Sequence, residues 1–544
     1  MAKGYRPVDR DQVFLFPPDM REWLPEGHPV WLVIAVVEQL DTRAFHAGRR
    51  LGGAGAAGYD PDMLLAVLVW AYARGVRSSR RIEELCRTDV GFRVICAGNL
   101  PDHCTVARFR GLFPGVVAGF FAEVLGLCAR LGMGQLGVVA LDGMKIAASA
   151  SKSANRSRER LRQLADEAVA AHAAADAAED ELSGEGRRGD EVPPGMWSPR
   201  SRKERIAAAL ADLEAEREAA EEAGRAKARE FRARQAAGQR TGCPPAAAAV
   251  ELAGEKLARA RAARAAQLER LEERYAAGGR RRREAGLEDY YLVRRAAAQV
   301  EKARARQQQV RDRAGARQAA RKGPGPVRNV TDPDSRLMPV RGGGFIQGYN
   351  AQNVTSSDGL IIATSLTADT SDTGWFAPMT AAAAGAAALI AAHRPGRRDP
   401  GPGPGGEIGL VLADAGYCSQ ANLTCAGPDR LIAVGKRRDL EKAARGRGEA
   451  DTDGGGAAIG AMRERLRTED GITAYRQRGH IAETPHGQIK HNMRFRQLSL
   501  RGKPKATAEW TFTCAVHNLF KAITTGHLTT TALDNLASPP ASPA

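Results

Sequence analysis

One glutamate, Glu483, stands among basic and aromatic residues in the segment YRQRGHIAETPHGQIK, residues 475 to 490. Two aspartates, Asp142 in LGVVALDGMK and Asp414 in EIGLVLADAG, each follow an apolar run that is typical of a buried strand. Three carboxylates that converge can hold two divalent cations roughly 3.5 to 4 Å apart, and hard oxygen ligands suit Mg²⁺ or Mn²⁺. One cation would activate an attacking oxygen and the other would stabilise the leaving oxygen of a phosphodiester. We therefore assign Asp142, Asp414 and Glu483 as metal-binding catalytic residues of phosphoryl transfer on nucleic acid.

Each of these acids also has a simpler interpretation. Asp142 and Asp414 could each cap a turn between a strand and a loop, as aspartates often do, and Glu483 could lie on a solvated surface. Asp439 and Glu441, in GKRRDLEK, also follow an apolar run, but the basic residues around them could pair with them on the surface. We favour the catalytic interpretation for the first three, because basic side chains around Glu483 would follow a nucleic-acid backbone and offset its repulsion.

Two strands and a helix are the elements that must position these acids. The apolar residues before Asp142 predict a strand, with Asp142 at or just past its end, and Asp414 is expected at the end of another strand. The pair Thr484–Pro485 indicates an N-cap and a first helical position, so Glu483 would lie at the mouth of a late helix. Lys490 follows seven residues after Glu483, about two helical turns, so the two side chains can point the same way.

The amino-terminal part of the chain has helical patterns. Residues 1 to 130 carry apolar residues at helical spacing, and Asp60 before Pro61 indicates a helix start. Four arginines in this part could either be solvated or contact a phosphate backbone, and the sequence leaves both interpretations open; they are Arg80, Arg81, Arg108 and Arg110.

Later segments differ in pattern. Residues 155 to 325 are dominated by Ala, Arg and Glu, which predicts a long helical insertion, either a hairpin or a coiled coil. GGGFIQGYNAQNV and GLIIATSLTA, joined by TSSDG, predict a β-hairpin. An alanine-rich helix is expected near residues 374 to 393.

The composition indicates a polyanionic partner. The 544 residues include 80 Lys and Arg against 63 Asp and Glu, a formal charge of +17, and nucleic acid fits this balance best. The first residues lack the apolar core of a signal peptide, and the apolar run at 379 to 392 is too short to span a bilayer of roughly 30 Å. We expect a cytoplasmic, nucleoid-associated protein with no membrane partner. The eight cysteines have no CxxC pair and no zinc-ligand spacing.

These residues also resemble motifs of the DDE transposases of bacterial insertion sequences. The family's signature of Y, two residues, R, three residues, E, six residues, K reads here Tyr475, Arg478, Glu483 and Lys490, with four residues between the arginine and the glutamate. LDGMKIAASAS resembles the first-Asp block, GYNAQNV the strand that follows it, and LADAGYCS the second-Asp block. PDHCTVARFR resembles the amino-terminal helical module, with Cys104 where serine is more usual. The resemblance covers residues 5 to 150 and 325 to 525, and is nearest the group numbered eleven eighty-two.

The resemblance implies an α/β fold with an RNase H-like catalytic domain that cuts DNA at the ends of its own mobile element and joins the freed 3′-hydroxyl to a target. It implies two Mg²⁺ or Mn²⁺ ions, and phosphate contacts from Tyr475, Arg478, Lys490 and Lys145. The partner would be double-stranded DNA, both the terminal inverted repeats and the target, bound by a homodimer. Two other classes of protein remain open: a catalytically inactive DNA-binding derivative of a transposase, and a metal-dependent nuclease that does not join strands.

Changes of pattern along the chain, together with this resemblance, suggest how the chain is organised. We expect a helical DNA-binding or assembly domain (1–130), the first part of the catalytic domain (131–154), the helical insertion (155–325), the remainder of the catalytic domain (326–530) and a disordered tail (531–544). The insertion would dimerise the protein or help to hold the element ends together. Trp375 could stack on a flipped base, although a tryptophan that starts an apolar helix is more often core. We interpret His480, His486 and His491 as solvated or phosphate-contacting.

Overall fold

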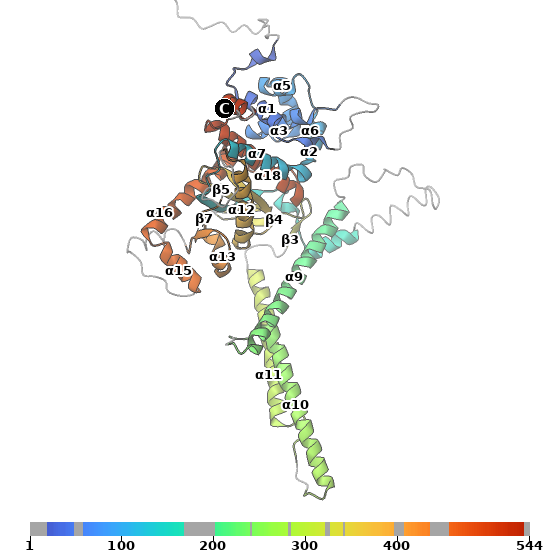
Figure 1. Ribbon diagram of the computed structural model, residues 1–544. Helices are drawn as coiled ribbons and strands as arrows, with labels where there is room; N and C mark the ends of the chain where they lie inside the picture. Colours follow the sequence, from blue (N-terminus) through green and yellow to red (C-terminus); the bar gives the residue numbers. More distant parts are fainter. Residues whose placement is uncertain are drawn as a thin grey trace, which may run out of the picture. The chain divides into compact units, whose positions relative to one another are not determined.

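The computed structural model describes the chain in two compact units. The described residues are 19–47, 58–167, 202–239, 242–280, 284–320, 327–340, 343–395, 407–435 and 456–537. The first unit comprises Met1–Ala154 with Asp334–Ala544, and the second comprises Asn155–Pro333, which contains the predicted insertion. Figure 1 labels the elements of both units, and each unit is described by itself below.

A mixed six-stranded sheet lies at the centre of the first unit. Its strands are β1 (Val138–Ala147), β4 (Arg336–Pro339), β5 (Phe345–Ser356), β6 (Ile361–Thr367), β7 (Leu410–Ala413) and β8 (Asp429–Ile432). The order is β4-β5-β1-β7-β8, and β6 also pairs with β5. Strand β5 runs antiparallel to β1, β4 and β6, whereas β7 is parallel to β1 and β8 is parallel to β7. The β5–β6 pair confirms the predicted hairpin, in which Gly359 adopts a positive φ of 88°.

Helices cover both faces of this sheet, as Figure 1 shows for α12 (Phe376–His393), α18 (Lys503–Thr524) and α16 (Glu469–Arg478). Side chains alternate along each strand: Val139 and Leu141 belong to the main core, which includes residues of α12, whereas Ala140 packs with Ile481 and Ala482 on the other face. Strands buried on both faces need apolar residues at successive positions. That requirement explains the continuous apolar runs before Asp142 and Asp414.

Short helices build the amino-terminal part of the first unit. They are η1 (Met20–Trp23), α1 (Pro29–Gln39), α2 (Arg43–His46), α3 (Pro61–Ala73), α4 (Ser79–Thr88), α5 (Val90–Cys96), α6 (His103–Arg110) and α7 (Phe113–Arg130). The start of α3 is as predicted, because the Asp60 side chain accepts from the Asp62 N–H and Pro61 is the first helical residue. Helix α3 is buried along almost all its length and packs against α18.

One of the four amino-terminal arginines has a role that neither interpretation predicts. Arg110 is buried, and it donates to the Arg77 carbonyl oxygen at 2.7 Å and to Ser79 Oγ at 2.6 Å. It therefore joins α6 to the start of α4, and both the solvated and the phosphate-contacting interpretation are wrong for it. Arg80, Arg81 and Arg108 are exposed.

The remaining elements of the first unit follow β1 and β6 in the chain. They are η2 (Lys152–Ala154), η3 (Thr373–Trp375), η4 (Ala415–Tyr417), α13 (Gln420–Thr424), α15 (Ala457–Arg465), η5 (Gly479–Glu483), α17 (Thr484–His491) and α19 (Thr530–Ala537). Helix α12 confirms the predicted alanine-rich helix. The prediction of a disordered tail is wrong for residues 531 to 537, which are helical and are held by Leu533, a buried residue of the main core. Residues 538–544 lie outside the described residues.

The second unit is mostly helical, as predicted for the insertion. It contains β2 (Asn155–Ser157), α9 (Arg202–Ala236), α10 (Ala246–Ala276), α11 (Tyr291–Ala320) and β3 (Val327–Asn329). Helices α10 and α11 run side by side in Figure 1 and pack on each other, so they form a helical hairpin. The two short strands pair antiparallel with each other. Buried Arg264 of α10 stacks on the Tyr290 ring with its guanidinium carbon 4.5 Å from the ring centroid.

Two segments would be long and apolar enough to cross a bilayer by length and composition alone, Phe113–Arg130 and Thr373–His393. Both contain helices of the first unit, and α7 and α12 pack against each other. Helix α7 also packs on α18, and α12 packs on β5 and β6. Their apolar side chains are therefore explained by the core of this unit.

Candidate active site

Asp142 and Asp414 lie on neighbouring strands of the sheet. Asp414 directly follows β7, as predicted, and caps η4 by accepting from the Gly416 N–H at 2.9 Å. Asp142 lies in the middle of β1, so the expectation that it ends a strand is wrong. The reason is that the parallel pairing of β1 with β7 stops at Leu141 and Ala413, whereas the antiparallel pairing with β5 continues to Ala147. Asp142 is therefore the first residue of β1 beyond its parallel neighbour, level with Asp414.

Glu483 lies inside one continuous helical segment, not at the start of a helix. Helix α16, the π-helical turn η5 and helix α17 follow one another without a break, and Glu483 is the last residue of η5. The predicted N-cap at Thr484 is wrong, since Thr484 is already helical. Pro485 would disturb a regular α-helix here because it has no N–H and its ring clashes with the preceding turn. The wider π-turn accommodates it, and such turns are frequent at functional sites.

Arg478, at the end of α16, contacts all three acids. Its Nη2 atom is 3.1 Å from Asp142 Oδ1 and 3.8 Å from Asp414 Oδ2, and its Nη1 atom is 3.7 Å from Glu483 Oε1. The first contact is a hydrogen bond and the other two are ion pairs at longer range. The Arg478 side chain is only 14% exposed, against 62% for Glu483. The three carboxylates predicted from distant parts of the sequence thus meet around one guanidinium.

The electrostatic surroundings move the pKa values of the two aspartates apart. Burial raises the pKa of Asp142, but the contact with His486 and the charge of Arg478 outweigh it, so the net pKa is lowered. Burial and the charge of Asp142 raise the pKa of Asp414, and the opposing charge of Arg478 is too weak to reverse this. Neighbouring carboxylates with pKa values shifted in opposite directions are typical of functional sites.

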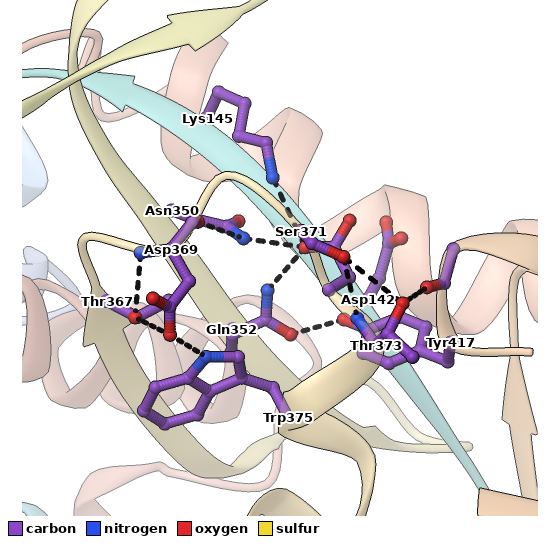
Figure 2. A network of polar contacts seen from close by, with 12 residues as sticks. Asp142, Lys145, Asn350, Gln352, Thr367, Asp369, Ser371, Thr373, Trp375 and Tyr417 are labelled. Atoms are coloured by element: carbon purple, nitrogen blue, oxygen red, sulfur yellow. Dashed lines mark hydrogen bonds and ion pairs between the residues drawn. The ribbon is translucent and has the colours of Figure 1, made fainter. Parts of the chain in front are cut away.

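Lys145 does not contact the three acids but binds a fourth, Asp372, at 3.2 Å between Nζ and Oδ1. The same carboxylate oxygen accepts from Asn350 Nδ2 at 2.6 Å and from Gln352 Nε2 at 2.7 Å. Figure 2 shows Lys145, Asn350 and Gln352 directed towards this network, with Tyr417 donating to the Gln352 amide oxygen. Sequence reasoning missed Asp372, although the two aspartates of TADTSD between a strand and a helix were visible.

Two glycines make room for Asp372 beside the predicted acids. A Cβ atom on Gly143, the residue after Asp142, would lie 2.6 Å from Asp372 Oδ1. A Cβ atom on Gly416 would lie 3.0 Å from Asp414 Oδ1 and 3.3 Å from Asp372 Oδ2. The carboxylates of Asp372 and Asp414 therefore lie beside the same glycine, and the charge of Asp372 contributes to the raised pKa of Asp414.

The remaining predicted residues surround the same region. Tyr475 donates its hydroxyl to the Ala413 carbonyl oxygen at 3.2 Å, directly before Asp414. Lys490 is partly buried, and burial lowers its pKa although the charge of Asp142 opposes the shift. The Trp375 indole N–H donates to Asp369 Oδ2 at 2.8 Å, and its ring packs against the main core.

His486 lies in an environment that sequence reasoning did not predict. It is buried, and its Nδ1 atom lies 3.4 Å from Asp142 Oδ2, so the solvated interpretation is wrong for it. His480 and His491 are exposed. No sequence signal distinguishes the three histidines, because burial of His486 depends on how α17 packs on the sheet.

Two other groups of acids bear on the assignment. Asp439 and Glu441 lie outside the described residues. Within the part of the chain that the structure describes, one group of three side chains could hold a metal ion by spacing alone. The group is His46, Asp60 and Asp62, whose potential ligand atoms all lie within 4.8 Å of one another. That group lies at the ends of α2 and α3, and two of its three residues are exposed. The three predicted acids are more widely spaced, because the Arg478 guanidinium lies among them.

Comparison with known proteins gives two matches to family models. Residues 18–112 match a transposase domain (DUF772) and residues 457–523 match a transposase DDE domain. The second match covers α15 to α18 and so includes Tyr475, Arg478, Glu483 and Lys490. No curated protein and no solved structure gave a match. Both regions are therefore similar to transposase domains, and DDE transposases normally use a divalent metal.

Proposed function

We propose that this protein is a transposase that cleaves DNA at the ends of its own insertion sequence and joins the freed 3′-hydroxyl groups to target DNA. The observation that carries this proposal is the meeting of Asp142, Asp414 and Glu483 around Arg478. We place it nearest the group numbered eleven eighty-two. We assign the catalytic domain to the RNase H-like class, because the first acid lies on a central strand and the second follows the adjacent parallel strand.

The three acids suit divalent cations. All their donor atoms are carboxylate oxygens, the ligands that Mg²⁺ and Mn²⁺ prefer. The acids are spread around one guanidinium, which fits two cations shared among them better than a single cation. When bound, such a pair would activate the attacking oxygen and stabilise the leaving oxygen of a phosphodiester. We infer that Asp142, Asp414 and Glu483 hold the cations.

The basic residues of the site would hold the negative charge of DNA next to the acids. Arg478 offsets the mutual repulsion of the three carboxylates and is placed to contact a phosphate between them. Lys490 lies within the electrostatic influence of Asp142, and Lys145 is held by Asp372. We keep these three residues and Tyr475 as proposed DNA contacts. Phosphate contacts of this kind position a duplex without reading its sequence.

We also propose that the protein acts as a homodimer on paired element ends. The first unit, with its amino-terminal helices, would bind DNA, and the helical hairpin of the second unit would help to hold two ends together. The formal charge of +17 supports binding to long stretches of phosphate backbone.

A strand-joining assay tests the proposal. Purified protein is mixed with labelled DNA that ends in the inverted repeats flanking its gene, a supercoiled plasmid, and Mg²⁺, Mn²⁺ or Ca²⁺. Joined products with Mg²⁺ or Mn²⁺ are expected, whereas Ca²⁺ should support binding better than chemistry. Cut ends that are never joined would identify a nuclease instead, and binding without any cutting would identify an inactive derivative.

The matched variants are Glu483→Gln and Glu469→Gln. Both glutamates are exposed and belong to the same continuous helical segment, but Glu469 lies in the first turn of α16, away from Arg478. Only Glu483→Gln should remove cleavage while DNA binding remains.

A further inference from the structure

Three side chains on adjacent strands form a line across the sheet that ends at the first acid. In the register of β1 and β5, Asp142 lies directly opposite Asn353. In the register of β5 and β6, Asn353 lies directly opposite Thr364. Side chains at directly opposed positions share one face of a sheet and lie within contact distance. His486, from α17, covers Asn353 on this face, with Nε2 3.1 Å from Asn353 Nδ2.

In the structure, the Asn353 amide turns its oxygen to β6 and its nitrogen to His486. Thr364 Oγ1 donates to Asn353 Oδ1 at 2.6 Å, so the amide oxygen faces β6. The Cys514 thiol, on α18, approaches the same oxygen from 4.0 Å. The amide nitrogen therefore faces His486. Asn353 is only 1% exposed, so water cannot readily replace these partners.

This orientation determines which nitrogen of His486 carries the proton. An amide nitrogen can only donate, so His486 Nε2 must accept from Asn353 and cannot itself be protonated. In a neutral imidazole the proton then lies on Nδ1. That atom faces Asp142 Oδ2 at 3.4 Å, while Arg478 binds the other oxygen of the same carboxylate at 3.1 Å. Each oxygen of Asp142 thus faces a different nitrogen, one of Arg478 and one of His486.

We propose that His486 is a positioning residue of the active site, which holds Asp142 through its Nδ1–H and receives this tautomer from Asn353 and Thr364. The consequence for catalysis rests on the proposed function, because it assumes that Asp142 binds a catalytic cation. A ligating carboxylate fixed by a neighbouring donor needs less reorganisation when the cation binds. His486 touches neither substrate nor cation in this role, and acts only through Asp142.

Two substitutions separate positioning from packing. The amide N–H of asparagine falls near the position of histidine Nδ1, whereas the amide of glutamine reaches the position of Nε2. His486→Gln should therefore lose the contact with Asp142 and lower both Mn²⁺ affinity and the cleavage rate about 10- to 100-fold. His486→Asn should keep a donor for Asp142 and stay within about threefold of the wild type in both measurements. His480→Asn, at an exposed position of the same helical segment, is the control.

Three measurements on the full-length protein complete the test. Mn²⁺ affinity is measured by electron paramagnetic resonance without DNA, and the cleavage rate is measured on labelled element ends. The tautomer of His486 is measured by ¹⁵N NMR of wild-type protein with labelled histidines. The His486 signal is assigned as the one that is lost in His486→Asn. The expected signal is that of an Nδ1-protonated imidazole. An Nε2-protonated signal overturns the proposal, and so do equal losses in both variants, which would indicate packing alone. A wild-type protein that binds Mn²⁺ and shows the expected tautomer but cuts no DNA would instead overturn the proposed function.

Discussion

Replacing Asp142 and Asp414 with asparagine should change the thermal stability of the folded protein in opposite directions. Asp142 has a lowered pKa, so its charged form is favoured by folding. It contributes stability that is present above the ordinary aspartate pKa of 3.8 and is lost as the pH falls through the lower folded value. Asp142→Asn removes a charge that Arg478 binds at 3.1 Å in a largely buried place. Hydrogen bonds to charged groups contribute about 1.5 to 3 kcal/mol. For a unit of about 365 residues, with an unfolding entropy of about 2.1 cal/mol/K per residue, each kcal/mol moves Tm by about 1.3 °C. Tm at pH 7 should therefore fall by about 2 to 4 °C.

The charge of Asp414 affects the stability of the folded protein in the opposite direction. Burial and the charge of Asp142 raise its pKa, so folding favours its protonated form. Stability falls as the pH rises from 3.8 through the higher folded pKa, and the deficit persists at neutral pH. Asp414→Asn removes that deficit. Its side chain is 42% exposed, so solvent screening limits the gain to about 1 kcal/mol or less, and Tm at pH 7 should rise by at most about 1.3 °C.

Differential scanning calorimetry without divalent cations measures both effects. Scans at pH 7 and at pH 3 are compared with those of Asp470→Asn, an exposed aspartate in the first turn of α16. The gain from Asp414→Asn should disappear at pH 3, where the carboxylate is protonated in both states. Equal shifts of Tm for the two site variants, or no difference from the control, would refute the electrostatic arrangement of these acids.

Three further predictions concern chemistry and DNA binding. Asp414→Asn and Glu483→Gln should each abolish cleavage, and the double variant should be little worse than either. The reason is that the rate losses from residues that act as a unit are strongly non-additive. Additive losses in the cleavage assay would argue for separate sites. Asp372→Asn should lower the cleavage rate by about tenfold, because the charge beside Asp414 is lost. Asp369→Asn, in the same loop, should leave the rate unchanged, because Asp369 binds Trp375. A larger loss of rate in Asp369→Asn than in Asp372→Asn would exclude Asp372 from the site. Lys490→Ala should reduce the log-log salt slope of DNA binding by about one, and an unchanged slope in filter binding would mean that it meets no phosphate.

The sequence predicts best those features that depend on neighbouring residues. The apolar run before Asp414 predicts a buried strand, and the structure ends that strand at Ala413. The turn residues around Gly359 predict the hairpin, since they control its connection locally. The start of α3 at Pro61 follows from Asp60 directly before it. In each case the physical cause lies within a few residues of the feature.

Features that depend on distant parts of the chain were not predictable in the same way. Strand β1 continues past Asp142 only because β5 pairs with it, and β5 follows some two hundred residues later. His486 and Asp372 join the site through contacts with Asn353 and Lys145, whose positions depend on the register of the sheet. A single sequence carries no local signal for such contacts, so a candidate list made from it contains the three acids and Arg478, but neither Asp372 nor the contact of His486 with Asp142.

The π-turn at Gly479–Glu483 explains how this chain accommodates one more residue between Arg478 and Glu483 than the transposase signature has. In a regular α-helix, residues four apart share a face, and one additional residue would rotate Glu483 away from Arg478 by about 100°. The i→i+5 bonding of a π-turn instead brings residues five apart into line. Arg478 Nη1 and Glu483 Oε1 are accordingly 3.7 Å apart. Burial of Ile481 and Ala482 against the sheet keeps the widened turn in place, so the extra residue changes the helix locally and leaves the meeting of the arginine with the third acid intact.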